Sequence, residues 1–339
     1  MSQKNSCRLA IIGAGDIVKT IHLPILTNIA SIESITLIDK SFQQAQKLSA
    51  LYKLTSLENI SQLSETQVNS IAICTPYGTR ESIIKEIPRD VWDRVRESGF
   101  LFLEKPAILN QSDYIRYQKM GIRVGVGFMR RYYSNTNQLK AWINQHPLSQ
   151  IKKITLREGY KSMASGLSEV NYRLDAKLSG GGVLAETGCH SIDQLVHILP
   201  DFTYQITDVD FIMDNEMDVD TQINATLKAE NVSIQLSCHY TRLNAMEPII
   251  QIDYDDYSIS CSVSAMNPVV IHGRSHRFIL QPDNRFALNA NQAFFLEWNS
   301  LLDDAPLHPE ISIRIENTSL GGLFIGDVYK YTNKKVKSL

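Results

Sequence analysis

The sequence has few cysteines, almost no net charge and no long apolar run, and each absence excludes a class of protein. Five scattered cysteines among 339 residues disfavour a disulfide framework or a metal site and fit a reducing, cytoplasmic compartment. A formal net charge of -2 provides no electrostatic footprint for nucleic acid or for an anionic membrane. No apolar stretch approaches the ~20 residues that cross a bilayer, and the N-terminal one is too short for a signal peptide.

A glycine-rich turn stands near the start of the chain, between a short apolar strand and a helix. The strand is predicted over residues 8–12 (RLAII), and GAGDIV follows it. The first glycine of such a turn makes it tight, the second lets the backbone approach a pyrophosphate, and the helix start offers N–H groups to phosphates. Val18 stands where the fingerprint has its third glycine. The predicted cofactor-binding residues of this turn are Gly13, Gly15, Asp16 and Ile17.

A second apolar strand, predicted over residues 34–38, ends at Asp39, about twenty residues beyond the glycines. A carboxylate at this place binds the ribose hydroxyls of the adenosine and repels a 2′-phosphate. The sequence therefore favours NAD as the cofactor. Lys40 and Ser41 follow directly and soften that preference, so NADP stays possible.

Strands and helices alternate as far as residue 128, which predicts an α/β Rossmann domain with a doubly wound parallel sheet over residues 1–129. Ligands bind such sheets at the carboxyl ends of the strands. The residues that fall there, and that we expect to face the cofactor, are Asp39, Thr75, Pro76, Glu104 and Lys105.

The pattern changes in the second half of the chain. Residues 204–280 show the period-two alternation of strands joined by short turns, which predicts an antiparallel sheet. Helices are expected over residues 133–145, 183–199, 289–302 and 313–331. We therefore predict an α+β domain over residues 130–339.

The stretch SGGGVLAETGCHSID, residues 179–193, combines three glycines with residues suited to acid–base chemistry. On the predicted helix Glu186, His190 and Asp193 share one face. A carboxylate one turn from an imidazole raises its pKa and orients it, and the glycines let the backbone pass close to a bound molecule. The alternatives are a solvated helix face with an ordinary ion pair, and for Asp193 a salt bridge instead of a substrate contact.

These motifs together resemble the Gfo/Idh/MocA oxidoreductases, the family of glucose-fructose oxidoreductase and inositol dehydrogenase. They are AIIGAGDI, Thr75-Pro76, the EKP of Glu104 to Pro106, and GGGVLAETGCHSID, and the resemblance extends over nearly the whole chain. The resemblance implies a Rossmann domain and a second domain with a large, mostly antiparallel open sheet that mediates dimers or tetramers. It also implies hydride transfer between NAD(P) and a hydroxyl-bearing carbon of a sugar, polyol or sugar nucleotide.

The resemblance assigns roles to residues as well. The family's catalytic lysine falls on Lys105 and its active-site histidine on His190, while Glu186 stands where the family usually has Asp. The family also implies a cis peptide bond before Pro106. Substrate or cofactor contacts often precede the glycines in this family, where Tyr172 and Arg173 stand. The expected substrate-binding residues are these two and Asp193, which follows the glycines.

The sequence departs from the family after Thr75-Pro76, where TPYGTRES lacks the usual histidine and the segment up to Glu104 is longer than usual. Two other functions therefore stay open: reduction of a C=N bond in a biosynthetic intermediate, and a non-catalytic regulator that senses a dinucleotide. The pair of Lys105 and His190 argues against the regulator. The expected partners are a small-molecule substrate and further copies of the chain, and not nucleic acid or a membrane.

Overall fold

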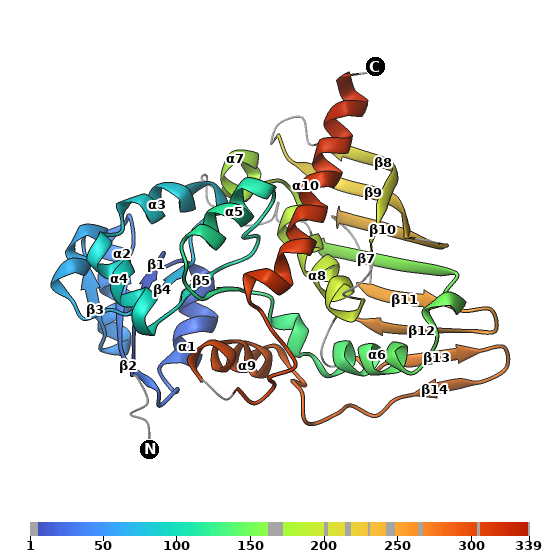
Figure 1. The fold of residues 1–339 in the computed structure, drawn as a ribbon, viewed down its shortest axis with the longest axis horizontal. Coiled ribbons are helices and arrows are strands. Elements are labelled where there is room, and N and C mark those ends of the chain that lie inside the picture. Colours follow the sequence, from blue (N-terminus) through green and yellow to red (C-terminus); the bar gives the residue numbers. More distant parts are fainter. Residues whose placement is uncertain are drawn as a thin grey trace. The chain divides into compact units, whose positions relative to one another are not determined.

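The computed structural model describes residues 6–161, 172–199, 203–213, 218–229, 231–241, 248–263, 267–303 and 306–337, which divide into two compact units (Figure 1). The first comprises the described parts of Met1–Ala107, Gln111–Gly127 and Phe294–Glu316. The second comprises those of Ile108–Asn110, Phe128–Ala293 and Asn317–Leu339. A single division at residue 129 does not describe this arrangement, because a C-terminal segment returns to the first unit.

A six-stranded sheet forms the centre of the first unit. Its order is β3-β2-β1-β4-β5-β6 and every neighbouring pair is parallel, which confirms the doubly wound sheet. β4 and β5 are buried along their whole length, as expected where both faces of a parallel sheet are covered. The strands are β1 (Cys7–Ile12), β2 (Ile32–Ile38), β3 (Thr55–Leu57), β4 (Ser70–Ile73), β5 (Leu101–Leu103) and β6 (Val124–Val126).

The helices of this unit begin with a π-helix, η1 (Val18–His22), which runs into α1 (Leu23–Leu26). α3 and α4 are separate because Pro88 disfavours a helical conformation at the residue before it, and Ile87 accordingly has ψ 125°. The other helical elements are α2 (Phe42–Tyr52), η2 (Ile60–Glu65), η3 (Tyr77–Thr79), α3 (Arg80–Glu86), α4 (Arg89–Ser98) and α5 (Gln111–Lys119).

The segment from Phe294 completes the first unit, although it lies far along the chain. Here the Val126 N–H donates to the Ile313 carbonyl oxygen at 2.9 Å, so the segment pairs with the β6 edge. Trp298 of α9 (Ala290–Leu302) is fully buried, and its ring centroid lies 4.3 Å from that of Phe102. A buried indole contributes a large apolar area, so this segment is part of the core of the first unit.

The second unit contains an eight-stranded sheet in the order β14-β13-β12-β11-β7-β10-β9-β8. β7 and β10 are parallel and all other neighbours are antiparallel, which confirms the large, mostly antiparallel sheet. The strands are β7 (Lys153–Lys161), β8 (Gln205–Met213), β9 (Asp220–Ala229), β10 (Val232–Thr241), β11 (Ile249–Asp253), β12 (Tyr257–Ser262), β13 (Val270–Gly273) and β14 (Arg277–Ile279).

Helices α6 and α8 pack on β12 and β7 of this sheet (Figure 1). The helix predicted over residues 183–199 begins as a π-helix and is nearly all buried, so the solvated-face alternative is wrong. Among the described helices none is long and apolar enough to cross a membrane. The helical elements are η4 (Met129–Tyr132), α6 (Ser134–Asn144), η5 (Leu148–Gln150), η6 (Tyr172–Leu174), α7 (Ala176–Ser179), η7 (Leu184–Gly188), α8 (Cys189–Ile198) and α10 (Ile315–Lys337).

Candidate active site

The glycine turn lies where the strand order reverses, between the ends of β1 and β4. Gly13 has φ +101°, and a Cβ on it would lie 2.9 Å from the Cys74 carbonyl oxygen, so the turn requires glycine there. A Cβ on Gly15 would meet nothing within 4 Å, which leaves space beside the second glycine. Helical residues begin at Asp16 and Ile17, directly after this space. The turn therefore fits the pyrophosphate of a dinucleotide.

Asp39 holds the glycine turn from the end of β2. Its Oδ2 accepts a hydrogen bond from the Ala14 N–H at 2.7 Å, and its Oδ1 accepts one from the Ser41 N–H at 2.8 Å. Each oxygen of a carboxylate has a second lone pair. The side chain can thus support the turn and still accept a ribose hydroxyl, and its ribose contact stays a prediction.

Lys105 follows β5 in a segment that is fixed on both sides. The Lys105-Pro106 bond is cis, as the family resemblance implies. The buried Arg80 guanidinium donates to the Pro106 carbonyl oxygen and, at 3.3 Å, to the Thr75 carbonyl oxygen. One side chain therefore ties the segment after β5 to Thr75, in the segment after β4.

Glu104 has a structural role where a cofactor contact was predicted. Its side chain is 11% exposed, its Oε2 accepts the Lys105 N–H at 3.1 Å, and its Oε1 lies 2.8 Å from His22 Nε2. Glu104 therefore holds the lysine segment, and its predicted contact with the cofactor stays a prediction. His22, in the sequence IHLPIL, is a residue that the sequence analysis missed.

Two of the three glycines, Gly181 and Gly182, are explained by contacts within the protein. Asp220 accepts hydrogen bonds from the Gly182 N–H at 2.6 Å, the Leu184 N–H at 3.0 Å and the Tyr329 hydroxyl at 2.9 Å. A Cβ on Gly182 would lie 2.0 Å from the Asp220 carbonyl oxygen, and one on Gly181 would lie 2.2 Å from the Tyr329 oxygen. The predicted close approach is thus made by β9 and α10, and no sequence pattern indicated these two partners.

Glu186 contacts Arg173, one of the residues expected to bind substrate. Its Oε1 lies 2.6 Å from Arg173 Nε, and the Arg173 guanidinium lies 5.4 Å from the ring centroid of Tyr172. Its Oε2 accepts the Tyr240 hydroxyl at 2.8 Å. Burial and the Glu186 carboxylate raise the pKa of Tyr240, so the phenol keeps its proton. The alternation of β10 puts Tyr240 on the same face as buried Cys238, a signal that sequence reading had available.

His190 is the second residue of α8 and is 9% exposed, with its ring edge-to-face with Phe128 at 6.1 Å. Since the preceding turn is a π-helix, whose bonds run from i to i+5, a spacing of four residues no longer implies a shared face with Glu186. The orientation of His190 by Glu186 stays a prediction.

Asp193 is 1% exposed, and its two oxygens accept bonds from Arg131 at 2.8 and 2.7 Å. Burial raises the pKa of Asp193, and the charge and hydrogen bonds of Arg131 oppose that rise. The structure therefore favours the salt bridge over the predicted substrate contact. The partner lies on η4 and not on the same helix.

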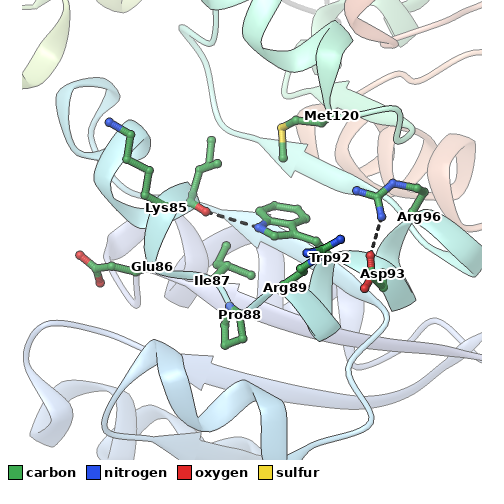
Figure 2. Close-up of a pocket in the computed structure, with 10 residues that line it drawn as sticks. Lys85, Glu86, Ile87, Pro88, Arg89, Trp92, Asp93, Arg96 and Met120 are labelled. Atoms are coloured by element: carbon green, nitrogen blue, oxygen red, sulfur yellow. Dashed lines mark hydrogen bonds and ion pairs between the residues drawn. The ribbon is translucent and has the colours of Figure 1, made fainter.

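A pocket of about 760 Å³ lies elsewhere in the first unit, beside α3, α4 and Met120 (Figure 2). Arg96 and Asp93 pair at 2.7 Å on its wall, and the Trp92 indole N–H donates to the Ile84 carbonyl oxygen at 3.4 Å. It is built on the longer segment between Thr75 and Glu104. None of the predicted site residues lines it, so we do not assign the chemistry to it.

The fold and these residues define a class of protein: an NAD-binding Rossmann unit combined with a sheet-containing unit. A family model described as "Oxidoreductase family, NAD-binding Rossmann fold" matches residues 7–132, and one for the "GFO/IDH/MocA C-terminal domain" matches residues 136–260. The chain belongs to the Gfo/Idh/MocA oxidoreductase family, and NAD-type dinucleotide binding is confirmed for its first domain.

Individual relatives are more distant. Glucose-6-phosphate 3-dehydrogenase of Bacillus subtilis is 24% identical over 192 residues, which are 56% of this chain and 53% of that protein. The match therefore spans about half the length of this curated relative. The crystal structure of a 3-ketoreductase from Actinomadura kijaniata, in complex with NADP and TDP-benzene, has a TM-score of 0.77 at 17% identity and covers 96% of this chain and 98% of its own. An inositol dehydrogenase homolog complexed with NAD+ from Azotobacter vinelandii has a TM-score of 0.77 at 14% identity, with 95% and 94% covered.

Proposed function

We propose that this protein is an NAD(P)-dependent oxidoreductase that moves a hydride between nicotinamide and the hydroxyl or carbonyl carbon of a sugar-like substrate. One observation carries the proposal. The glycine turn, Thr75 and Lys105 follow β1, β4 and β5, which are three neighbouring strands of one parallel sheet. The phosphate-binding turn and a candidate acid–base amine therefore lie along the same edge of the first unit.

In this mechanism the bound nicotinamide supplies the hydride acceptor for oxidation or the donor for reduction. Gly13, Gly15 and Asp39 hold the dinucleotide, and Lys105 polarises the substrate oxygen. During oxidation the C–H electron pair leaves with its hydrogen as hydride, and the hydroxyl proton passes to the acid–base group of Lys105 and His190. In reduction the same group returns a proton to the carbonyl oxygen. Glu186 is proposed to support His190.

We further propose that the reacting carbon is C3 of a hexose ring. The name of the Bacillus subtilis relative places its reaction at C3, and the Actinomadura kijaniata structure is that of a 3-ketoreductase. Tyr172, Arg173 and Glu186 supply polar groups suited to sugar hydroxyls. Both relatives support this position without establishing it for this chain.

The test is a turnover screen with NAD+ and NADP+ against glucose, glucose 6-phosphate, a methyl glucoside and inositol. Reduced nicotinamide is followed by absorbance and the position of the new ketone by NMR. We expect Lys105→Met and His190→Asn each to lower kcat by ~10²- to 10⁴-fold, the usual contribution of acid–base groups. In the double variant the losses are expected to be far from additive, because residues that act as a unit do not add. Lys85→Met, which changes an exposed lysine paired with Glu81, is the matched control.

Three results would contradict parts of this proposal. Parent-level turnover by Lys105→Met removes the lysine from the mechanism. Turnover of cyclic imines but of no sugar favours the C=N reductase. If the protein binds NADH but turns over no substrate, and if NADH changes its binding to a protein partner, the regulator is favoured.

Cofactor preference and assembly are proposed on the same basis. We propose NAD over NADP because of Asp39, and separate titrations with NADH and NADPH test it; clear preference for NADPH contradicts the role of that carboxylate. We also propose a homodimer or homotetramer through the open sheet of the second unit. Light scattering of the purified protein tests this, and a monomer at micromolar concentration contradicts it.

A further inference from the structure

Three buried side chains of the first unit form a hydrogen-bonded chain that ends beside Lys105. The Trp298 Nε1–H donates to His22 Nδ1 at 3.1 Å, His22 Nε2 lies 2.8 Å from Glu104 Oε1, and Glu104 Oε2 accepts the Lys105 N–H at 3.1 Å. Trp298 and His22 are both fully buried. The first and last of these residues lie on α9 and after β5, so the chain crosses the core of the unit.

The donor in the first link determines the state of the histidine. An indole nitrogen only donates, so the Nδ1 atom of His22 must present a lone pair. The ring proton is then on Nε2, and His22 is a neutral donor to Glu104. The edge-to-face rings of Phe102, Phe294 and Trp298, with centroids 5.5–5.7 Å from that of His22, leave the imidazole little freedom to turn.

The carboxylate in the middle is ionised. Burial opposes its charge, but the hydrogen bond from His22 and the nearby cations Lys105 and Arg80 outweigh burial, so the pKa of Glu104 lies below its ordinary value. Glu104 is charged and forms two hydrogen bonds, so it fixes the backbone from which the Lys105 side chain projects.

We propose that His22 and Trp298 are positioning residues for Lys105, acting through Glu104. The relay, defined as Trp298, His22 and Glu104, holds one side of the lysine segment, while Arg80 holds the other. The proposal rests on the proposed role of Lys105 in catalysis. Because misplacement of a reacting group by about 1 Å costs on the order of 10²-fold in rate, the relay is expected to affect kcat more than KM.

Two substitutions, His22→Gln and His22→Asn, distinguish the hydrogen bond between His22 and Glu104 from the one between His22 and Trp298. The Gln amide nitrogen is as far from Cα along the side chain as His Nε2, so His22→Gln keeps a donor toward Glu104. His22→Asn places its polar atoms near the former Nδ1 and loses Glu104. We expect His22→Asn to lower kcat by ~10- to 100-fold with KM for cofactor and substrate within about threefold, and His22→Gln to recover most of the loss. Trp298→Phe, which removes only the indole N–H among polar groups, is expected to have an intermediate effect.

Phe294→Leu is the packing control, because Phe294 touches the His22 ring without a hydrogen bond in the chain. It should lower the melting temperature and leave kcat unchanged. A loss of kcat in Phe294→Leu as large as that in His22→Asn overturns the proposal, since packing alone would then explain both. Parent-level kcat in His22→Asn overturns it as well.

Two measurements decide the relay independently of turnover. NMR of the protein with ¹⁵N-labelled histidine, with the His22 signal identified by its absence in His22→Gln, is expected to show a proton on Nε2 and none on Nδ1. Hydrogen-exchange mass spectrometry is expected to show faster exchange of the peptide containing the Lys105 amide in His22→Asn than in the parent. A proton on Nδ1, or unchanged exchange at Lys105, overturns the relay. If Lys105→Met is fully active, the proposed function fails at that residue, and these two measurements still decide whether the relay holds the lysine segment.

Discussion

His197 is neutral in the folded protein and becomes charged on unfolding in acid. It is 5% exposed on α8, the helix that also carries His190. Burial, together with the positive charges of Arg131 and Lys140, lowers the pKa of His197 from 6.5 to about 2. Acid should therefore destabilise the element that holds the proposed catalytic histidine.

The sign and size of the effect follow from linkage between protonation and folding. Because the pKa is lower in the folded state, the unfolded state binds more protons, and the stabilisation present above about pH 6.5 is lost as the pH falls. Between about pH 7.5 and about pH 4.5 the imidazole becomes protonated in the unfolded state. The lower pH lies about two units below the unfolded pKa, and each of these units lowers the free energy of unfolding by about 1.36 kcal/mol, so this residue accounts for a loss of about 3 kcal/mol. The folded state contributes almost nothing there, since its pKa of about 2 lies far below this range.

The assay is urea unfolding of the parent and of His197→Gln at both pH values. Glutamine does not titrate and keeps a donor near Asn137 Oδ1, which lies 3.4 Å from His197 Nε2. We expect the variant to lose about 3 kcal/mol less than the parent on acidification, and His276→Gln, at an exposed site, to behave like the parent. An equal loss in His197→Gln and the parent refutes the reasoning. The same variant is needed when activity is measured as a function of pH. A loss of activity at low pH that is absent in His197→Gln results from unfolding and does not report the protonation of His190.

Four further substitutions, at three positions, test the candidate residues of each unit. Gly15→Ala adds a Cβ into open space, so it should leave the melting temperature unchanged and weaken NADH binding by ~10-fold or more, and equal affinity would contradict the pyrophosphate role. Gly182→Ala would press on the Asp220 carbonyl at 2.0 Å, so it should destabilise the protein by at least about 2 kcal/mol in urea unfolding. Glu186→Asp should lower kcat/KM more than Glu186→Gln, measured with the substrate that the screen identifies; the reverse order would show that charge matters more than reach.

The parallel sheet could be predicted from the sequence because its buried strands are short apolar runs separated by helical periodicity. β1 and β4 are examples, each buried almost throughout and each followed by a turn motif. β3 could not be predicted, since Thr55–Leu57 has only three residues at the edge of the sheet and none of them is fully buried. The return of Phe294–Glu316 to the first unit could not be predicted either, because a helix pattern shows an apolar face but not the surface that covers it.

The positions of the site residues in the chain were predictable, but their partners were not. Lys105 stands after a strand in the sequence and in the structure, as the EKP motif indicates. His22 is 82 residues from Glu104 and 276 from Trp298, so no spacing rule connects the three. The glycines before Glu186 suggest a nearby ligand in the sequence, but glycine permits any close approach, and only the fold shows that Asp220 is the neighbour of Gly182.

The glutamate at position 186, where the family usually has aspartate, has a physical explanation in its two partners. Arg173 lies on η6 and Tyr240 on β10, and each engages a different oxygen of the same carboxylate. Aspartate would withdraw the carboxylate by about 1.5 Å, the length of one C–C bond, which exceeds what an ion pair of 2.6 Å and a hydrogen bond of 2.8 Å can absorb without movement of either partner. The π-helical turn that carries Glu186 further changes the direction of its side chain relative to an α-helix. The departure from the family is therefore coupled to Arg173, one of the residues expected to bind substrate.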